Sequence, residues 1–201
     1  MAKRAWNHNT FYHPLLLRQV PTHAKDALDI GCGDGIFACK LLQRGLRVTA
    51  VDVDEGEVAK SRLIAPGASI ICGDFMELAL EPATFDFVGS LAVFHHLPFA
   101  DALKMASELL RERGTLAILG VWVDTSTQSD AVWNCASSTI NRLCRHVWGP
   151  DVMSSPQKMP LVTLDQTRAL VRAILPHAKV RRLPLWRYLI TWTRDAGNLR
   201  C

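Results

Sequence analysis

Between Lys25 and about residue 123, short apolar runs alternate with stretches in which apolar residues recur at helical spacing. Uninterrupted apolar runs predict buried strands, and apolar residues three or four positions apart predict amphipathic helices. Such alternation is typical of repeated βαβ units, which form an α/β fold around a parallel sheet. We predict strands at 26–30, 47–53, 68–74, 85–92 and 115–123, and helices at about 35–45, 54–66 and 98–114.

The pattern changes after Val123, where a helical stretch at 129–149 and a proline-punctuated loop interrupt the alternation. Together they predict a helical insert over residues 124–162. We expect the apolar stripe of its helix to roof an acceptor pocket, while a plain core position, a dimer contact or a membrane contact remain alternatives. The stripe consists of Val132, Ala136, Ile140, Leu143 and Val147.

The chain closes with one more helical pattern at 163–176 and two strand patterns at 179–185 and 186–194. The helix opens with a Thr or Asp that can cap its first turn. The two strands are joined so tightly that we predict an antiparallel hairpin.

Composition and charge narrow the class of protein. The 201 residues are 49% hydrophobic and 21% charged, which predicts one globular domain over residues 1–201. No segment has the length of a membrane span and the start lacks a signal-peptide pattern, so we expect a cytoplasmic protein without stable membrane anchoring. The six cysteines lack metal-site spacing, so we expect reduced thiols and no metal. The net charge of +4 comes without a nucleic-acid motif, and we expect no nucleic-acid partner.

The stretch "ALDIGCGDGIF" at 27–37 carries candidate chemistry, because its glycines follow the first predicted strand directly. A turn that binds a dinucleotide needs G-x-G-x-x-G spacing, with the third glycine close to the following helix. Here the glycines are Gly31, Gly33 and Gly35, and Ile36 occupies the position of that third glycine. The sequence therefore predicts a tight, open turn without the dinucleotide signature.

Three acidic residues lie at the ends of adjacent predicted strands. Asp29 ends the first strand, Asp52 ends the second, 21 residues after Gly31, and Asp74 ends the third. A carboxylate in the position of Asp52 can accept hydrogen bonds from both hydroxyl groups of a ribose. Carboxylates beside a turn that lacks a phosphate cradle suit a nucleoside that bears an amino-acid cation. Asp29 and Asp74 acting only as turn caps is the alternative.

The segments "LDIGCGDG", "VDVDEGEVAKSR", "GDFMEL" and "FDFVGSLAVFHHL" resemble, in order, the signature segments of class I S-adenosylmethionine-dependent methyltransferases. The resemblance covers about residues 27–123. It implies a Rossmann-like sheet of seven strands, mostly parallel with an antiparallel last strand, and helices on both faces. The whole chain is also similar to a group of bacterial methyltransferase-domain proteins that share "WNHNTFYHPLLL" and "RRLPLWRYLITWT", and whose substrates are mostly unassigned.

The resemblance also implies roles in binding S-adenosylmethionine. It places the methionine amino group near Asp29 and near the backbone of Gly31, Cys32 and Gly33. It places the ribose on Asp52 and Leu91 beside the cofactor. It also places the adenine against Val53, with Asp74 and Phe75 at its edge. It further implies that residues 1–24 form a lid over the methionine end, with Tyr12 touching the cofactor. A plain surface helix is the alternative for this opening segment.

Transfer of a methyl group from a sulfonium is an in-line displacement, and a hydroxyl acceptor benefits from a general base. His95 follows the fourth predicted strand and is the first candidate base; His13 is the second. A loop histidine bound to a backbone carbonyl is an equal alternative for His95. The segment "GSLAVFHHLP" departs from the motif that serves amino groups of nucleic-acid bases in this superfamily, which favours a small-molecule acceptor, with a lipid head group as the alternative.

We expect methyl transfer to a small molecule, with a hydroxyl group as the acceptor, by a monomer or homodimer. Two alternatives remain at this point. One is an S-adenosylmethionine-binding protein with a scaffold or non-methylating catalytic role, and the other is a nicotinamide-dependent oxidoreductase. The choice among oxygen, nitrogen and carbon as the acceptor atom also stays open.

Overall fold

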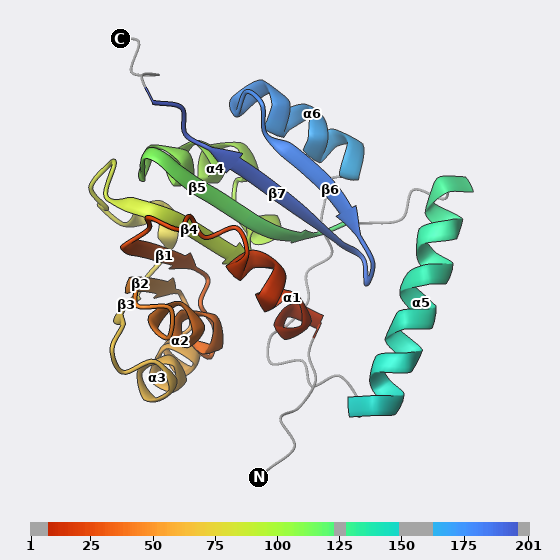
Figure 1. The fold of residues 1–201 in the computed structure, drawn as a ribbon, viewed down its shortest axis with the longest axis horizontal. Helices are drawn as coiled ribbons and strands as arrows, with labels where there is room; N and C mark the ends of the chain where they lie inside the picture. The colour runs from red at the N-terminus through yellow and green to blue at the C-terminus, as the bar shows by residue number, and fades with distance from the viewer. Residues whose placement is uncertain (1–7, 123–127, 149–162, 197–201) are drawn as a thin grey trace.

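A computed structural model describes residues 8–122, 128–148 and 163–196 (Figure 1). Seven strands form a single sheet in the order β3-β2-β1-β4-β5-β7-β6. β7 runs antiparallel to both β5 and β6, while β1 to β5 pair in parallel. This confirms the predicted topology. The strands are β1 (Asp26–Ile30), β2 (Arg47–Asp52), β3 (Ser69–Cys72), β4 (Phe85–Leu91), β5 (Leu110–Val121), β6 (Lys179–Leu183) and β7 (Arg187–Thr193).

Helices cover both faces of the sheet, as predicted. α1 and α2 bury residues in one apolar cluster, with α3 packed beside α2, and α4 and α6 bury residues in a second cluster on the opposite face. Successive side chains of a strand point to opposite faces, so each strand feeds both clusters. The helices are α1 (His8–Leu17), α2 (Ile36–Leu42), α3 (Glu55–Ile64), α4 (Phe99–Glu108), α5 (Gln128–Trp148) and α6 (Leu164–Ile174), with short 3-10 turns η1 (Phe75–Glu77) and η2 (Phe94–His96).

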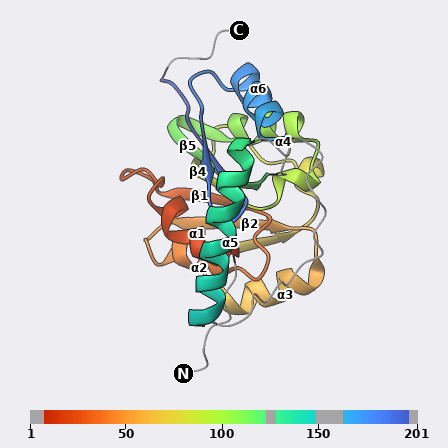
Figure 2. The same ribbon diagram turned by 90° about the vertical axis from the view of Figure 1, so that its right-hand side faces the viewer.

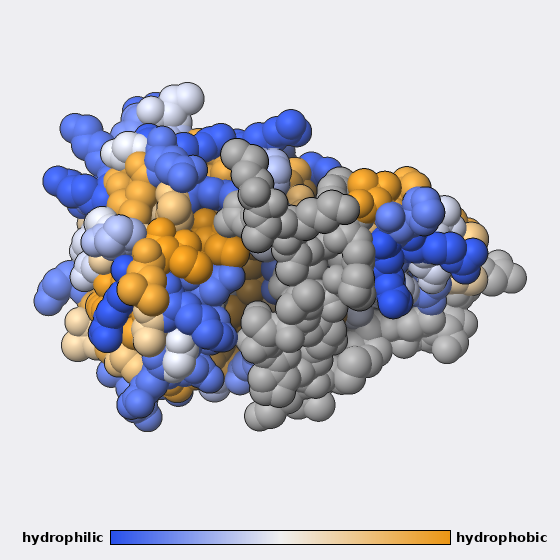
Figure 3. Space-filling model, turned by 90° about the horizontal axis from the view of Figure 1, so that it is seen from below, coloured by the Kyte–Doolittle hydropathy of each residue, from blue (hydrophilic) through white to orange (hydrophobic). Residues whose placement is uncertain are grey.

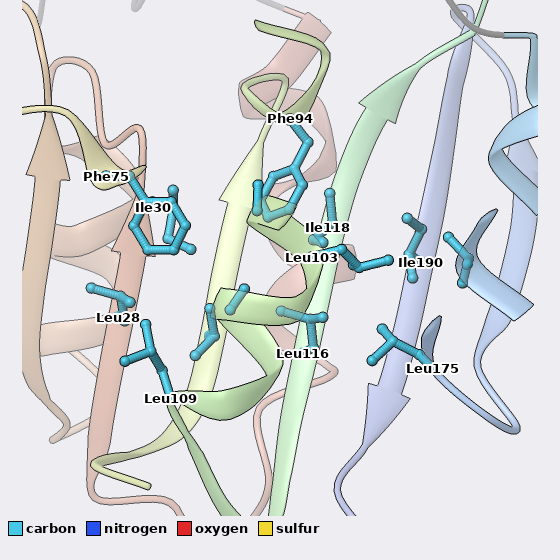
Figure 4. Close-up of a cluster of buried hydrophobic side chains, with 14 of the residues drawn as sticks. Leu28, Ile30, Phe75, Phe94, Leu103, Leu109, Leu116, Ile118, Leu175 and Ile190 are labelled. Atoms are coloured by element: carbon cyan, nitrogen blue, oxygen red, sulfur yellow. The ribbon is translucent and has the colours of Figure 1, made fainter. Parts of the chain in front are cut away.

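The cluster on the α4–α6 face shows how this alternation builds the core. Leu28 and Ile30 of β1 and Leu116 and Ile118 of β5 point to the side on which Leu103 of α4 lies (Figure 4). All five side chains are fully buried. Burying such a side chain contributes about 1.5 to 3 kcal/mol, so this face fixes the register of the central strands.

β5 begins five residues earlier than the sequence predicts. The expectation that a helix continues to Gly114 is wrong, because α4 ends at Glu108 and Leu110 pairs with Phe85 of β4. Arg111, near the start of β5 in the part that the sequence predicts as helix, forms ion pairs with Asp26 at 2.7 Å and with Asp86 at 3.1 Å. Strand pairing and this ion-pair network outweigh the helical propensity of the segment.

α5 forms where the insert helix is predicted, but three of the five residues of its apolar stripe face solvent. Val132, Leu143 and Val147 are exposed by 69%, 62% and 55%. Hydrophobic as well as hydrophilic residues face solvent on the α5 side of the molecule, at the right of Figure 3. The helix turns a different face, which includes Ser137 and Cys144, toward the body of the protein. It lies outside the two helix layers, near the β6–β7 edge of the sheet (Figures 1 and 2). The remainder of the predicted insert lies outside the described residues.

A buried arginine accounts for the orientation of α5. Arg182 of β6 forms an ion pair with Asp130 of α5 at 2.5 Å, and its guanidinium stacks on Trp122 at 3.8 Å and on Trp133 at 5.4 Å. A buried charge must be paired, and the ion pair therefore directs a polar face of the helix inward. Within the described ranges no helix is both long and apolar enough to cross a membrane.

The Arg182–Asp130 pair should contribute far more to stability than an exposed pair. Asp130→Ala leaves a buried guanidinium without its carboxylate and should lower the free energy of unfolding by about 3 to 5 kcal/mol. Asp165→Ala is the matched control, because Asp165 is 89% exposed in its pair with Arg168, and should cost less than about 1 kcal/mol. Urea unfolding measures both, and equal losses would contradict this role.

Candidate active site

A cavity of about 500 Å³ lies at the carboxyl ends of β1, β2, β3 and β4. The chain leaves β1 toward β2 on one side and crosses to β4 on the other, so the strand order reverses between β1 and β4. In open α/β sheets this reversal creates a crevice, and ligands bind there. The position and the volume are those of a small-molecule site.

The glycine turn after β1 forms one wall of the cavity. Gly31, Gly33 and Gly35 have φ values of 71°, 51° and 80°, which favour glycine. A Cβ atom on Gly31 would lie 2.1 Å from a methyl group of Val93, so this position also requires the absence of a side chain. The turn is therefore held by close packing against the segment that follows β4.

Asp52 ties the glycine turn to the end of β2. One carboxylate oxygen accepts a hydrogen bond from the N–H of Gly33 at 2.8 Å, and the other accepts from the N–H of Asp54 at 3.0 Å. A carboxylate has about four acceptor positions, so these two bonds leave capacity for a ligand. Asp52 lines the cavity together with its neighbour Val53, which is 72% exposed.

Asp29 lies at the cavity with its charge uncompensated. Its side chain is fully buried, and neither oxygen has a hydrogen-bond partner among the described residues; the N–H of Ala38 faces the carboxyl but falls short of hydrogen-bond geometry. Burial, followed by repulsion from Asp52 and Asp34, raises the pKa of Asp29 to about 8. An unpaired buried carboxyl beside a cavity is the complement of a cationic ligand group.

The charges around the cavity have one sign. Five aspartates line it, and none of the described lining residues is a lysine or arginine. This lining disfavours phosphate groups and attracts cations, which argues against a nicotinamide dinucleotide. Burial raises the pKa of the Cys32 thiol to about 12, so this lining residue stays protonated. The five aspartates are Asp29, Asp34, Asp52, Asp54 and Asp74.

Most of the residues that the sequence assigns to the cofactor meet at this cavity, but Tyr12 does not line it. The Tyr12 hydroxyl donates a hydrogen bond to the carbonyl of Pro184 at 2.7 Å and anchors α1 to the β6–β7 turn. Another face of α1 reaches the cavity instead, through Asn9, Thr10 and His13. The assigned residues that line it are Asp29, Gly31, Cys32, Gly33, Asp52, Val53, Asp74, Phe75 and Leu91.

The adjacent histidines of η2 have different surroundings. His96 lines the cavity, whereas His95 is absent from its lining, and the Nδ1 atom of His95 is buried without a hydrogen-bond partner in the described part of the chain. Burial, with smaller effects of His96 and Arg187, lowers the pKa of His95 to about 4. The site residues predicted from the sequence do not include His96, Asn9 and Thr10, which also line the cavity. The i, i+4 spacing of Asn9 and His13 was the available signal for α1.

Comparisons with known proteins identify the family. Residues 28–118 match a family described as a methyltransferase domain. An uncharacterised methyltransferase of Mycobacterium tuberculosis is 37% identical to this chain, over 93% of this chain and 96% of that protein. The chain belongs to the class I S-adenosylmethionine-dependent methyltransferases.

Other relatives of this methyltransferase differ in their acceptors. The ubiquinone biosynthesis O-methyltransferase of Stutzerimonas stutzeri is 29% identical over 57% of this chain and 56% of its own length. The solved structure of Haemonchus contortus phosphoethanolamine N-methyltransferase 2, in complex with S-adenosylmethionine, has a TM-score of 0.62 and 18% identity, over 86% of this chain and 38% of that one. One of these proteins is an O-methyltransferase and the other an N-methyltransferase, so the shared fold does not fix the acceptor atom.

The methyl donor of this enzyme is S-adenosylmethionine. The lining of the cavity fits this donor in two respects. Its sulfonium and ammonium groups are cations, and the lining is acidic without a lysine or arginine among its described members. In addition, the buried carboxyl of Asp29 has no partner among the described residues, and its ionised form would complement a cation.

Close packing at Gly31 should make a side chain there more destabilising than the backbone conformation alone would. Gly45 has a similar φ of 81° but nothing within 4 Å of an added Cβ, so Gly45→Ala measures the conformational cost alone, about 1 to 2 kcal/mol. Gly31→Ala should lower the free energy of unfolding by about 1 to 3 kcal/mol more, because Val93 must move. It should also weaken S-adenosylhomocysteine binding, while Gly45→Ala should not. Chemical unfolding and calorimetry test this, and matching losses in the two variants would contradict it.

The raised pKa of Asp29 predicts binding that depends on pH. At pH values below about 8 the carboxyl is protonated, and pairing with an ammonium group must first release that proton. The affinity for S-adenosylhomocysteine should therefore increase from about pH 6 to about pH 8 and then level off. Titration calorimetry across this range measures it. Asp29→Asn should remove the dependence, and an affinity of the wild type that does not change with pH would show that Asp29 does not pair with the ligand.

Proposed function

We propose that this methyltransferase transfers the methyl group of S-adenosylmethionine to a hydroxyl group of a small molecule, with His96 as the general base. The observation that carries the proposal is that His96 lines the same acidic cavity as Asp29 and Asp52. A volume of about 500 Å³ suits a small ligand rather than a macromolecule. The likeness to a ubiquinone biosynthesis O-methyltransferase supports a hydroxyl acceptor.

The lining suggests how the donor is held. Asp52 accepts hydrogen bonds from the ribose hydroxyls with the acceptor capacity that its backbone partners leave. The exposed Val53 and the buried Phe75 flank the adenine, with Asp74 at its edge. Asp29 pairs with the ammonium group.

When bound, S-adenosylmethionine supplies an electrophilic methyl group on a sulfonium. The protein then contributes alignment and exclusion of water, since the transfer needs the acceptor oxygen in line with the bond that breaks. Apolar side chains on the β4 side of the cavity can exclude water: Leu91, Val93 and Leu97.

Three histidines are candidates for the base, and their surroundings favour His96. A base works best with a pKa near the operating pH, and the pKa of His95 lies near 4. His13 has its Nδ1 atom 3.0 Å from the Nζ atom of Lys40, which favours a donor rather than a base on its other nitrogen. His96 lines the cavity, and its side chain is exposed. We therefore assign the base to His96 rather than to His95 or His13, the candidates that the sequence favours.

Labelled S-adenosylmethionine and matched acceptor pairs test the proposal. Each pair should combine a phenol with the corresponding aniline, and mass spectrometry should find the label on the phenol oxygen. His96→Gln should lower turnover by about 10²- to 10⁴-fold without weakening S-adenosylhomocysteine binding. His95→Gln, the matched control next to it, should change turnover much less.

Two results would contradict the proposal. Methylation of the anilines alone would exclude a hydroxyl acceptor, and a larger loss in the His95 variant would return the role of base to His95. Tight cofactor binding without transfer to any acceptor, across extracts as well as pure compounds, would instead favour a scaffold or non-methylating role.

A further inference from the structure

The glycine turn has little capacity to bind an anion. The N–H groups of Gly31 and Cys32 both donate to the carbonyl of Val51, at 2.8 and 3.0 Å. Gly33 donates to Asp52 at 2.8 Å, and Gly35 donates to the carbonyl of Cys32 at 3.0 Å. These donors are engaged within the protein, and the carboxylates around them repel a negative ligand group.

S-adenosylmethionine nevertheless carries a carboxylate on the same carbon atom as its ammonium group. If the ammonium lies at Asp29, the carboxylate must lie close by and needs donors from outside the turn. α1 supplies polar side chains on that part of the wall: Asn9, Thr10 and His13. The oxygen of Asn9 accepts from Arg187 at 3.2 Å, so this side chain is already committed in part to β7.

His13 is held in a defined orientation. The ring is 4% exposed and packs against Phe37 with 5.2 Å between the ring centroids. Its Nδ1 atom lies 3.0 Å from the Nζ atom of Lys40, which projects from α2. An ammonium group has only donors, so Nδ1 accepts and the ring proton resides on Nε2. Lys40 thereby makes Nε2 of His13 a hydrogen-bond donor.

We propose that His13 donates a hydrogen bond from Nε2 to the carboxylate of the cofactor's amino-acid end, and that Lys40 is the positioning residue that fixes its tautomer. The positive charge of Lys40 behind His13 and the negative charge of Asp29 then match the two charges of the amino-acid zwitterion. The anchor of Tyr12 on Pro184 holds α1 in place for this contact. The assignment goes beyond the proposed function, because it is independent of the acceptor and of the base.

Two ligands that differ only in the amino-acid end test the assignment. S-adenosylhomocysteine carries that end, whereas 5′-methylthioadenosine keeps the adenosine and the thioether without it. His13→Phe retains the ring packing but no donor, and Lys40→Met retains the aliphatic stem without the charge. Both variants should weaken S-adenosylhomocysteine binding by about tenfold to a hundredfold, as expected for a hydrogen bond to a charged group. Their affinity for 5′-methylthioadenosine should stay within about twofold of the wild type.

Two further variants complete the calorimetric measurement. Lys60→Met removes another lysine of the same charge, paired with Glu57 on α3, and should change neither affinity. His13→Gln places an amide donor near the position of Nε2 and should recover part of the loss. If His13→Phe fails to fold, Lys40→Met and His13→Gln still carry the test.

Equal losses for the two ligands would overturn the proposal, because they would indicate a general packing role for α1. Unchanged S-adenosylhomocysteine binding in Lys40→Met and His13→Phe would overturn it as well. The measurement contains no acceptor, so a failure of methyl transfer to hydroxyl groups leaves its outcome unaffected.

Discussion

The site depends on the hydrogen bonds that fix the glycine turn between β1 and β2. The carbonyl of Val51 accepts from two successive N–H groups of the turn, and the carboxylate of Asp52 accepts from a third. These bonds hold the turn at the end of β2. Because Gly31 has no side chain, Val93 can pack directly against the turn. The sheet then opens into a cavity at the point where its strand order reverses.

The same arrangement determines what the cavity can bind. With its N–H groups used internally, the turn does not cradle phosphate, and the aspartates around it produce a negative potential. Asp29 is the extreme case, because it is buried without a counter-charge and held partly protonated. A cationic ligand group would relieve this energetic cost, which is consistent with a sulfonium cofactor.

Local patterns predicted the elements that bury apolar side chains on both faces of the sheet, and the acidic residues at the strand ends. Predictions from local patterns failed where contacts between residues far apart in the sequence determine the structure. Leu110 fits a helix or a strand, and only its pairing with Phe85 selects the strand. Much of the apolar stripe of α5 is exposed, because the buried Arg182–Asp130 pair directs a polar face of the helix inward. Tyr12 and His95 have suitable chemistry but do not line the cavity, because long-range packing sets which faces of α1 and of η2 meet it.

The most direct test of the account is a crystal structure of the protein with S-adenosylhomocysteine bound, grown at a pH above 8, where Asp29 ionises. The account predicts the adenosine over Val53 and Phe75, the ribose hydroxyls on Asp52, and the ammonium nitrogen within hydrogen-bond distance of Asp29. A ligand that binds elsewhere, or one that binds in the cavity while the carboxyl of Asp29 stays without a partner, would contradict it.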